Sequence, residues 1–210
     1  MKKNWQYKLR NFTSVNIGAF ETYFADMPYD PYVNGNFRKR RFSSVKKDDL
    51  GNWKLLPHKT FTQTADVNDL LGDVVREYEE INEDLINSSA FAKVLNGFVN
   101  LSEINSYTTD IGIHQMRILC SEYIKGEPAP EGRHQDGFDN VGIFCARRVN
   151  VKGGVSELFL NKDDKKPILK KKLRQNELLI VNDREVFHNA TKLSPTGLEL
   201  GYRDVFVFTA

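Results

Sequence analysis

The apolar residues in the first half of the chain recur mostly at helical spacing. Over residues 74–85 they fall on one side of a helix and acidic residues on the other, which predicts an amphipathic helix. A second helix is predicted to begin at Ser88 and Ser89, whose hydroxyls can cap its first turn, and to continue through Phe98. An earlier helix is predicted over residues 15–24. Residues 1–107 are therefore expected to form a helix-rich N-terminal part.

The pattern changes after about residue 108, where short runs rich in β-branched and aromatic residues follow one another. Strands are predicted over residues 111–119, 141–149, 155–160, 168–173, 178–181 and 205–209. Turn-forming residues separate these runs. Because helices come first and strands afterwards, without strand–helix alternation, the expected fold class is mainly β with N-terminal helices. We expect a β-sandwich or jelly roll over residues 108–210, within a single domain that spans residues 1–210.

The composition changes this picture little, but it excludes several functions. The chain has 210 residues, and its 30 basic and 28 acidic residues leave a net charge of +2, so nothing favours binding to nucleic acid or to a membrane. No apolar stretch is long enough for a membrane span, and the basic start lacks the apolar segment of a signal peptide. Cys120 and Cys145 are predicted to be buried free thiols, and the expected location is the cytoplasm.

The segment from Glu131 to Gly137 carries the candidate chemistry. In an extended chain, residues two apart project from the same face, so His134 and Asp136 can reach one ion together. An imidazole nitrogen and a carboxylate oxygen suit a first-row divalent metal, and one further histidine would complete the two-histidine, one-carboxylate triad of non-haem iron oxygenases. Three protein ligands on one face leave three positions open, two for a 2-oxo acid and one for dioxygen.

His188 is the predicted third ligand. It follows the predicted strand at 178–181 and a turn at 182–184, and it lies far enough beyond Asp136 for a jelly roll to fold it back beside the first pair. The alternative is that His134 and His188 are unrelated surface histidines, since a His-x-Asp motif is common by chance. Taken together, the residues favour a metal site formed by these three side chains, which would be both the metal ligands and the catalytic centre.

Arg203 stands at the start of the final predicted strand, a short distance beyond His188. A guanidinium at this position can bind the distal carboxylate of 2-oxoglutarate through two parallel hydrogen bonds. The alternative is a structural ion pair, for example with the neighbouring Asp204. The position of Arg203 relative to His188 favours the role in cosubstrate binding.

Several segments of the chain together resemble the bacterial 2OG-Fe dioxygenases related to L-isoleucine dioxygenase. The similarity is carried by Pro130-Glu131-Gly132-x-His134-Gln135-Asp136-Gly137, Gly153-Gly154-x-Ser156, the His188 segment and the terminal Gly-Tyr-Arg-Asp-Val. Asp30-Pro31-Tyr32 and the run from Phe37 to Ser43 also look like that group. The resemblance thus reaches from about residue 30 to the C-terminus, and its most specific part is 130–209.

The resemblance implies a double-stranded β-helix, which is a cupin-like jelly roll. It also implies an Fe(II)- and 2-oxoglutarate-dependent dioxygenase that hydroxylates a free aliphatic L-amino acid such as isoleucine, leucine or methionine, with O2 as cosubstrate and ascorbate supporting activity. The family's iron ligands map onto His134, Asp136 and His188, and its cosubstrate arginine maps onto Arg203. Some related oxygenases carry a Ser or Thr two residues after this arginine. Val205 stands there, so the second partner of the carboxylate is unassigned.

The substrate-binding residues are open at this stage. Arg117 lies in the predicted strand at 111–119, and its side chain can face either the pocket, as a carboxylate clamp, or solvent. Glu131 can receive a substrate ammonium or be an exposed loop acid. The basic run 38–41 can supply another carboxylate contact or form a solvated face. The remaining histidines, His58 and His114, are expected to be structural or exposed.

Two other functional classes compete with amino-acid hydroxylation. The same chemistry can act on a peptide, a derivatised amino acid or a carrier-bound residue, and activity on free amino acids discriminates against that reading. A non-catalytic jelly-roll binding protein would keep the metal ligands but would form no succinate. Zinc-dependent hydrolysis is disfavoured, because no motif identifies the general base that it needs.

Overall fold

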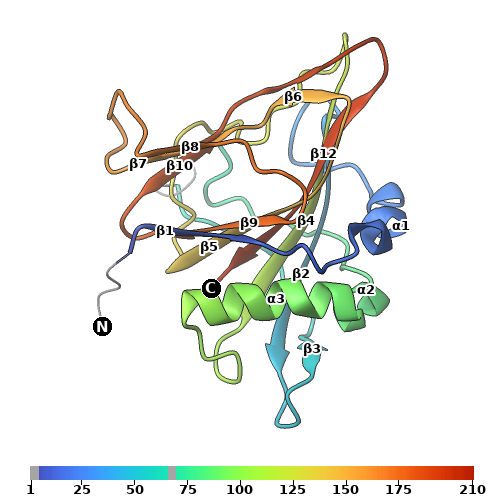
Figure 1. Cartoon of the computed structure of the whole chain (residues 1–210), viewed down its shortest axis with the longest axis vertical. Helices are drawn as coiled ribbons and strands as arrows, with labels where there is room; N and C mark the ends of the chain where they lie inside the picture. Colours follow the sequence, from blue (N-terminus) through green and yellow to red (C-terminus); the bar gives the residue numbers. More distant parts are fainter. Residues whose placement is uncertain (1–4, 66–69) are drawn as a thin grey trace.

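A seven-stranded antiparallel sheet forms the centre of the molecule in the computed structural model, which describes residues 5–65 and 70–210 (Figure 1). Its strands are, in spatial order, β1 (Tyr7–Asn11), β9 (Glu177–Asn182), β5 (Asn140–Val149), β12 (Gly201–Thr209), β4 (Ile111–Cys120), β2 (Arg38–Lys47) and β3 (Trp53–Leu55). A three-stranded sheet contains β10 (Phe187–Ala190), β7 (Ser156–Phe159) and β8 (Leu169–Lys171), and β11 (Leu193–Pro195) pairs with β6 (Val151–Gly153). This architecture is a jelly roll, so the expected fold class is confirmed.

The central strand β12 has the largest hydrophobic core on one side and the cavity of the candidate site on the other. Its register with β4 and β5 turns Phe206 and Phe208 toward the helices, where they join the largest hydrophobic core. The alternate residues Arg203, Val205 and Val207 face the opposite side of the sheet and line a cavity. Because successive side chains of a strand point to opposite faces, one strand supplies both the stabilising core and the wall of the candidate site.

The helices cover one face of the main sheet (Figure 1). They are the 3-10 helix η1 (Ile17–Phe20), α1 (Glu21–Ala25), α2 (Glu83–Asn87) and α3 (Ser89–Ser102). The hydroxyl of Ser88 accepts a hydrogen bond from the Phe91 amide at 3.2 Å, so the predicted cap of α3 is confirmed. The helix expected over residues 15–24 is present as η1 followed by α1.

The helix predicted over residues 74–85 is wrong, because only its last three residues belong to a helix, α2. Arg76 exchanges both backbone hydrogen bonds with Phe61, at 2.7 and 2.9 Å. The carbonyl of Glu79 accepts from the amide of Phe42 on β2, at 3.0 Å. These contacts hold the segment in an extended conformation, so long-range pairing overrides the helical spacing of its apolar residues.

The N-terminal part also contributes three strands that the sequence pattern did not predict. β1, β2 and β3 belong to the main sheet, and β2 pairs with β4 along eight residues in register. The N-terminal part that was expected to be helix-rich therefore contains both helices and strands of the main sheet. Both cysteines are buried and free, as predicted. Within the described residues, no helix has the length and apolar character that crossing a membrane requires.

Substitution of Phe206 by Ala is expected to destabilise the fold strongly. Phe206 is fully buried, and its ring lies 4.9 Å from the rings of both Phe24 and Phe91. Its truncation should lower the free energy of unfolding by about 3–5 kcal/mol, measured by denaturant titration. Leu198→Ala, at a residue that is 94% exposed, is the control and should change it by less than about 0.5 kcal/mol. Equal effects of the two substitutions would contradict this account of the core.

Candidate metal centre

Two segments far apart in the sequence meet through their backbones at the candidate site. His134 lies in the loop between β4 and β5, and His188 lies on β10. The amide of His134 donates to the carbonyl of His188 at 3.0 Å, and the reciprocal hydrogen bond is 2.8 Å. This isolated antiparallel bridge holds the loop against the smaller sheet. The sequence predicted that a later segment would fold back beside the first pair, and the structure brings the two together.

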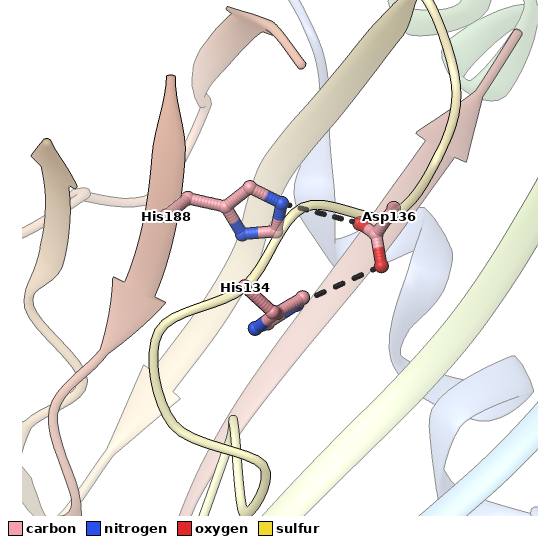
Figure 2. A group of neighbouring side chains, drawn as sticks. All are labelled: His134, Asp136 and His188. Atoms are coloured by element: carbon pink, nitrogen blue, oxygen red, sulfur yellow. Dashed lines mark ion pairs between the residues drawn. The ribbon is translucent and has the colours of Figure 1, made fainter. Parts of the chain in front are cut away.

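The side chains of His134, Asp136 and His188 converge on one point (Figure 2). The Nε2 atom of His134 lies 3.6 Å from Oδ1 of Asp136, and Nε2 of His188 lies 3.4 Å from Oδ2 of the same carboxylate. The three candidate ligand atoms all lie within 4.8 Å of one another. Two imidazoles and a carboxylate at this spacing fit a first-row divalent cation.

The imidazole of His134 is oriented by its own loop. Its Nδ1 donates to the carbonyl of Gly132 at 2.9 Å, which directs Nε2 toward Asp136. Ligating histidines are commonly held in this way, with the second ring nitrogen bonded to a carbonyl or a carboxylate. Glu131 also approaches this ring, with its carboxylate 3.2 Å from Nε2. Glu131 therefore lies beside the candidate metal position, half-buried rather than fully exposed.

The three side chains perturb one another's protonation. Burial lowers the pKa of His188, but hydrogen bonds to Asp136 and Asp183 raise it to about 10. Burial and the neighbouring His188 lower the pKa of His134, but Asp136 raises it by more. The pKa of Asp136 stays well below its usual value despite burial, because both imidazoles favour the carboxylate form. The site therefore pairs an ionised carboxylate with two imidazoles that favour the protonated form, and a divalent cation would bind there by displacing their protons.

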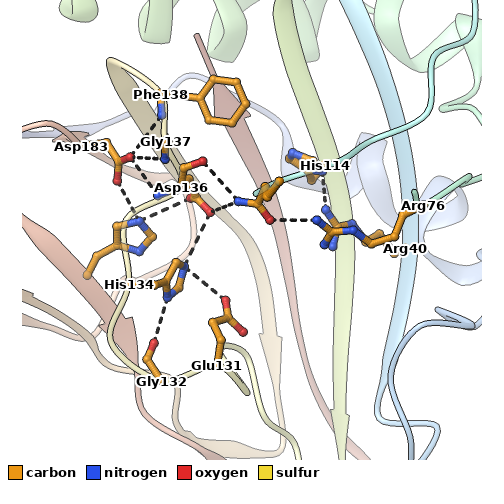
Figure 3. Close-up of polar contacts among 12 residues, drawn as sticks. Arg40, Arg76, His114, Glu131, Gly132, His134, Asp136, Gly137, Phe138 and Asp183 are labelled. Atoms are coloured by element: carbon orange, nitrogen blue, oxygen red, sulfur yellow. Dashed lines mark hydrogen bonds and ion pairs between the residues drawn. The ribbon is translucent and has the colours of Figure 1, made fainter. Parts of the chain in front are cut away.

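Asp183 fixes the position of the triad, and the sequence analysis missed it. Its side chain is fully buried, and Oδ2 accepts hydrogen bonds from the amides of Asp136, Gly137 and Phe138 at 2.8, 2.9 and 3.3 Å (Figure 3). Its other oxygen lies 3.1 Å from Nε2 of His188. Gly137 has a φ of +87°, which favours glycine and lets the three amides point at one carboxylate. The sequence marked residues 182–184 only as a turn, and no local signal distinguishes this aspartate.

The triad opens into a cavity whose walls come from both sheets and from the loops. The lining includes Pro128, Ala129 and Pro130 of the β4–β5 loop, together with Met116, Ile118, Val141, Ile143, Val205 and Val207 of the main sheet. These apolar side chains form a wall beside the polar triad. A cavity that combines an apolar wall with convergent polar groups is typical of a small-molecule site.

Arg203 points into this same cavity. It is 2% exposed, and neither Nε nor Nη2 has a hydrogen-bond partner among the residues that the structure describes. Its stem lies against Gly154, where an added Cβ would come within 3.2 Å of the Arg203 Cδ. A buried guanidinium with unpaired donors fits an incoming carboxylate, so the arrangement suits the distal end of 2-oxoglutarate.

Arg117 lies on the opposite face of the sheet. Its guanidinium donates two hydrogen bonds to the Asp204 carboxylate, at 2.7 and 2.8 Å, and it does not line the cavity. This pairing also removes the alternative in which Asp204 neutralises Arg203. The sequence left open whether the Arg117 side chain faces the pocket or solvent. In the structure it forms an ion pair with Asp204 outside the cavity.

The basic run 38–41 divides between the two faces of β2. Arg38 and Arg40 face the cavity, whereas Arg41 donates to the carbonyls of Asp26 and Glu80 outside it. Arg76 lines the cavity as well, and the sequence analysis did not identify it.

The other two histidines have different surroundings. His114 is buried in the cavity wall, and the pKa of its imidazole lies well below the usual value because of burial and neighbouring Arg40. His58 lies outside the cavity near Glu77 and Glu80, at 3.6 and 3.8 Å. Neither imidazole belongs to the metal-ligand cluster, in keeping with the structural or exposed roles expected for them.

Comparison with known proteins identifies related chains. The model of a family described as 2OG-Fe dioxygenase matches residues 21–209, which confirms the resemblance seen in the sequence. A curated relative, 3(1)-hydroxy-L-isoleucine 4-dioxygenase of Pantoea ananatis, is 27% identical over 141 residues. The aligned region covers 63% of this chain but only 56% of that relative, so the match spans little more than half of the relative's length.

Two solved structures share the fold. A bsmA homologue from Methylobium petroleophilum superposes with a TM-score of 0.81 at 23% identity, covering 98% of this chain and 88% of the other. IDO from Bacillus thuringiensis gives a TM-score of 0.74 at 17% identity, covering 92% of this chain and 81% of the other. At these identities the likeness shows the jelly-roll fold, and the chemistry has to be argued from the site itself.

Substitution of Asp183 by Asn is expected to weaken divalent metal binding. The amide cannot accept all the hydrogen bonds that the buried carboxylate accepts, so the loop that carries Asp136 loses its anchor. Affinity for Co(II), measured by titration calorimetry, should fall by about 10- to 100-fold. Asp139→Asn is the matched control, because that side chain is 68% exposed and pairs with Arg184. Unchanged affinity in a folded Asp183→Asn protein would contradict the positioning role.

Proposed function

The chain belongs to the 2OG-Fe dioxygenase family, and from this premise we propose that it hydroxylates a free aliphatic L-amino acid. The reaction consumes 2-oxoglutarate and O2 and releases succinate and carbon dioxide. The metal ligands in this proposal are His134, Asp136 and His188. The observation that carries it is the convergence of these three side chains in one cavity with the guanidinium of Arg203, whose Nε and Nη2 have no partner among the described residues.

Fe(II), when bound, supplies the activation of dioxygen that is coupled to oxidation of the 2-oxo acid. The protein's own groups have other tasks. In the proposal Arg203 binds the distal carboxylate of 2-oxoglutarate with charge-assisted hydrogen bonds, which fixes the cosubstrate between the cavity wall and the triad. Asp183 holds the loop that carries Asp136 by accepting hydrogen bonds from three of its backbone amides, and the carbonyl of Gly132 orients the imidazole of His134.

The apolar wall supports an aliphatic substrate. Val141, Ile143, Val205 and Val207 lie on neighbouring strands and face the cavity, so an alkyl side chain can displace water there. Holding one carbon of that chain near the metal decides which C–H bond reacts. Glu131, beside His134, is the proposed contact for the substrate ammonium. The two free thiols support a reducing cytoplasmic location.

The curated relative supports the same substrate class. Its name describes dioxygenation of a hydroxylated isoleucine, which is a free branched amino acid. Discrimination by one methylene in an apolar pocket is worth only about 1–3 kcal/mol, so related chains can prefer different aliphatic side chains. The proposal therefore names a substrate class and leaves the individual amino acid to measurement.

The proposal is tested by incubating the protein with Fe(II), ascorbate, 2-oxoglutarate, O2 and a panel of free L-amino acids. We expect succinate together with an amino acid that has gained one oxygen atom, both detected by mass spectrometry. His134→Ala should abolish both products, whereas His58→Ala, outside the cavity, should retain them. Succinate without an oxidised amino acid would move the substrate to another class. If folded, iron-loaded protein forms no succinate, the chain is a binding protein.

Substitution of Arg203 by Met is expected to weaken 2-oxoglutarate binding while keeping the shape of the side chain. Loss of a charge-assisted bidentate contact should raise the KM for 2-oxoglutarate by about 10- to 100-fold, measured from succinate formation. Arg147→Met is the control, because Arg147 lies on the neighbouring strand β5 and pairs with Glu21 on the other face of the sheet. An unchanged KM in Arg203→Met would remove the proposed contact.

A further inference from the structure

Two buried arginines in the cavity wall have no place in the metal centre or in the cosubstrate contact. Arg40 is 7% exposed and Arg76 is 2% exposed, and both line the cavity that contains the triad. Figure 3 shows them side by side next to His114. Arg40 comes from β2, whereas Arg76 comes from the extended segment that replaces the expected helix. Two distant parts of the chain thus place two cations in the wall of one cavity.

Among the residues that the structure describes, neither guanidinium contacts a carboxylate. Nη2 of Arg40 lies 2.7 Å from Nδ1 of His114, and Nη2 of Arg76 donates to Oε1 of Gln63 at 3.0 Å. The Nε atoms of both arginines have no hydrogen-bond partner within residues 5–65 and 70–210. Arg38, also on β2, differs in this respect because it forms a buried ion pair with Asp30 at 2.7 Å.

Burying two like charges is costly when no carboxylate of the described residues contacts either of them. Burial, together with the neighbouring Arg38 and Arg76, lowers the pKa of Arg40 to about 10, so the group is still protonated at neutral pH. Aromatic faces offset part of this cost, since the Arg40 guanidinium lies 4.4 Å from the Tyr78 ring and that of Arg76 lies 4.6 Å from the Phe61 ring. A bound carboxylate would supply the missing counter-charge and accept from the unpaired donors.

Arg40 and Arg76 lie in a different part of the cavity wall from Arg203. The strand that carries Arg40 is the second neighbour of β12 in the sheet, which corresponds to about 10 Å between the two strands. Gln63 bridges the pair to the metal centre, because its amide donates to Oδ1 of Asp136 at 3.3 Å while its carbonyl accepts from Arg76. An anion held by the pair would therefore lie beside the metal centre, in a different place from the distal carboxylate of 2-oxoglutarate.

We propose that Arg40 and Arg76 form a carboxylate-binding subsite for the primary substrate, which must therefore carry a free carboxylate. This inference rests on the proposed function and narrows it. A free amino acid satisfies the requirement, whereas an amide, an ester, a carrier-bound thioester or a residue inside a peptide replaces the anion with a neutral carbonyl. His114 and Gln63 are positioning residues for the two guanidinium groups.

The test compares acids with their amides. L-Isoleucine, L-leucine, L-methionine and the three corresponding amides are titrated calorimetrically, under nitrogen, into the protein loaded with Fe(II) and 2-oxoglutarate. At least one acid should bind about 10- to 100-fold more tightly than its amide, because a hydrogen bond to a charged group is worth about 1.5–3 kcal/mol. In Arg76→Met this preference should fall to about threefold or less. Amides that bind as tightly as the acids, or a protein that binds neither, would overturn the proposal.

Arg41→Met is the matched control, since Arg41 neighbours Arg40 on β2 but contacts only groups outside the cavity. It should keep the full preference for the acid. Arg40→Met is the second variant, used if thermal melting shows that Arg76→Met is unfolded, and it should also lose the preference. If either variant is folded and still prefers the acid over its amide, the carboxylate subsite is refuted. This holds even if the wild-type protein forms succinate and an oxidised amino acid. Absence of succinate from wild-type protein would instead refute the proposed function.

Discussion

The alternation of side chains along β12 is the constraint on which the core and the cavity both depend. Phe206 and Phe208 enter the core beneath the helices, and Arg203 and Val205 face the cavity. The strand is hydrogen-bonded on both sides, to β5 and to β4, so its register is fixed by two partners. A slip of one residue would place a guanidinium in the core and an aromatic ring in the cavity, so apolar burial also fixes the direction of the polar groups.

The negative and positive groups of the cavity come from different structural elements. Asp136 provides a carboxylate between two imidazoles, whereas Arg40 and Arg76 provide cations on the side of β2. Little water screens these groups, so each interacts strongly with a ligand of opposite charge. The same burial makes each unpaired group costly, and the fold bears this cost through its aromatic core. The buried arginines therefore lower the stability of the fold and at the same time suit the binding of anionic ligands.

Sequence pattern was a good guide where structure is local. The runs at 111–119 and 141–149 are strands, and the Ser88 cap begins a helix, because alternation and capping depend on neighbouring residues. The pattern failed over residues 74–85, where backbone hydrogen bonds to Phe61 and β2 hold an extended chain. It also missed β2, whose basic residues do not resemble a buried strand until their aromatic and carboxylate partners are known.

The sequence by itself determined which donor groups were available, namely the His-x-Asp pair, a later histidine and an arginine near the end. It could do so because metal and carboxylate chemistry follows from residue type. Only the tertiary structure decided which of these groups meet. The backbone bridge between His134 and His188, and the carboxylate of Asp183 beneath it, join segments far apart in the chain. Arg117 and Arg203 are both strand arginines, and only the phase of each strand relative to the core places one outside the cavity and the other within it.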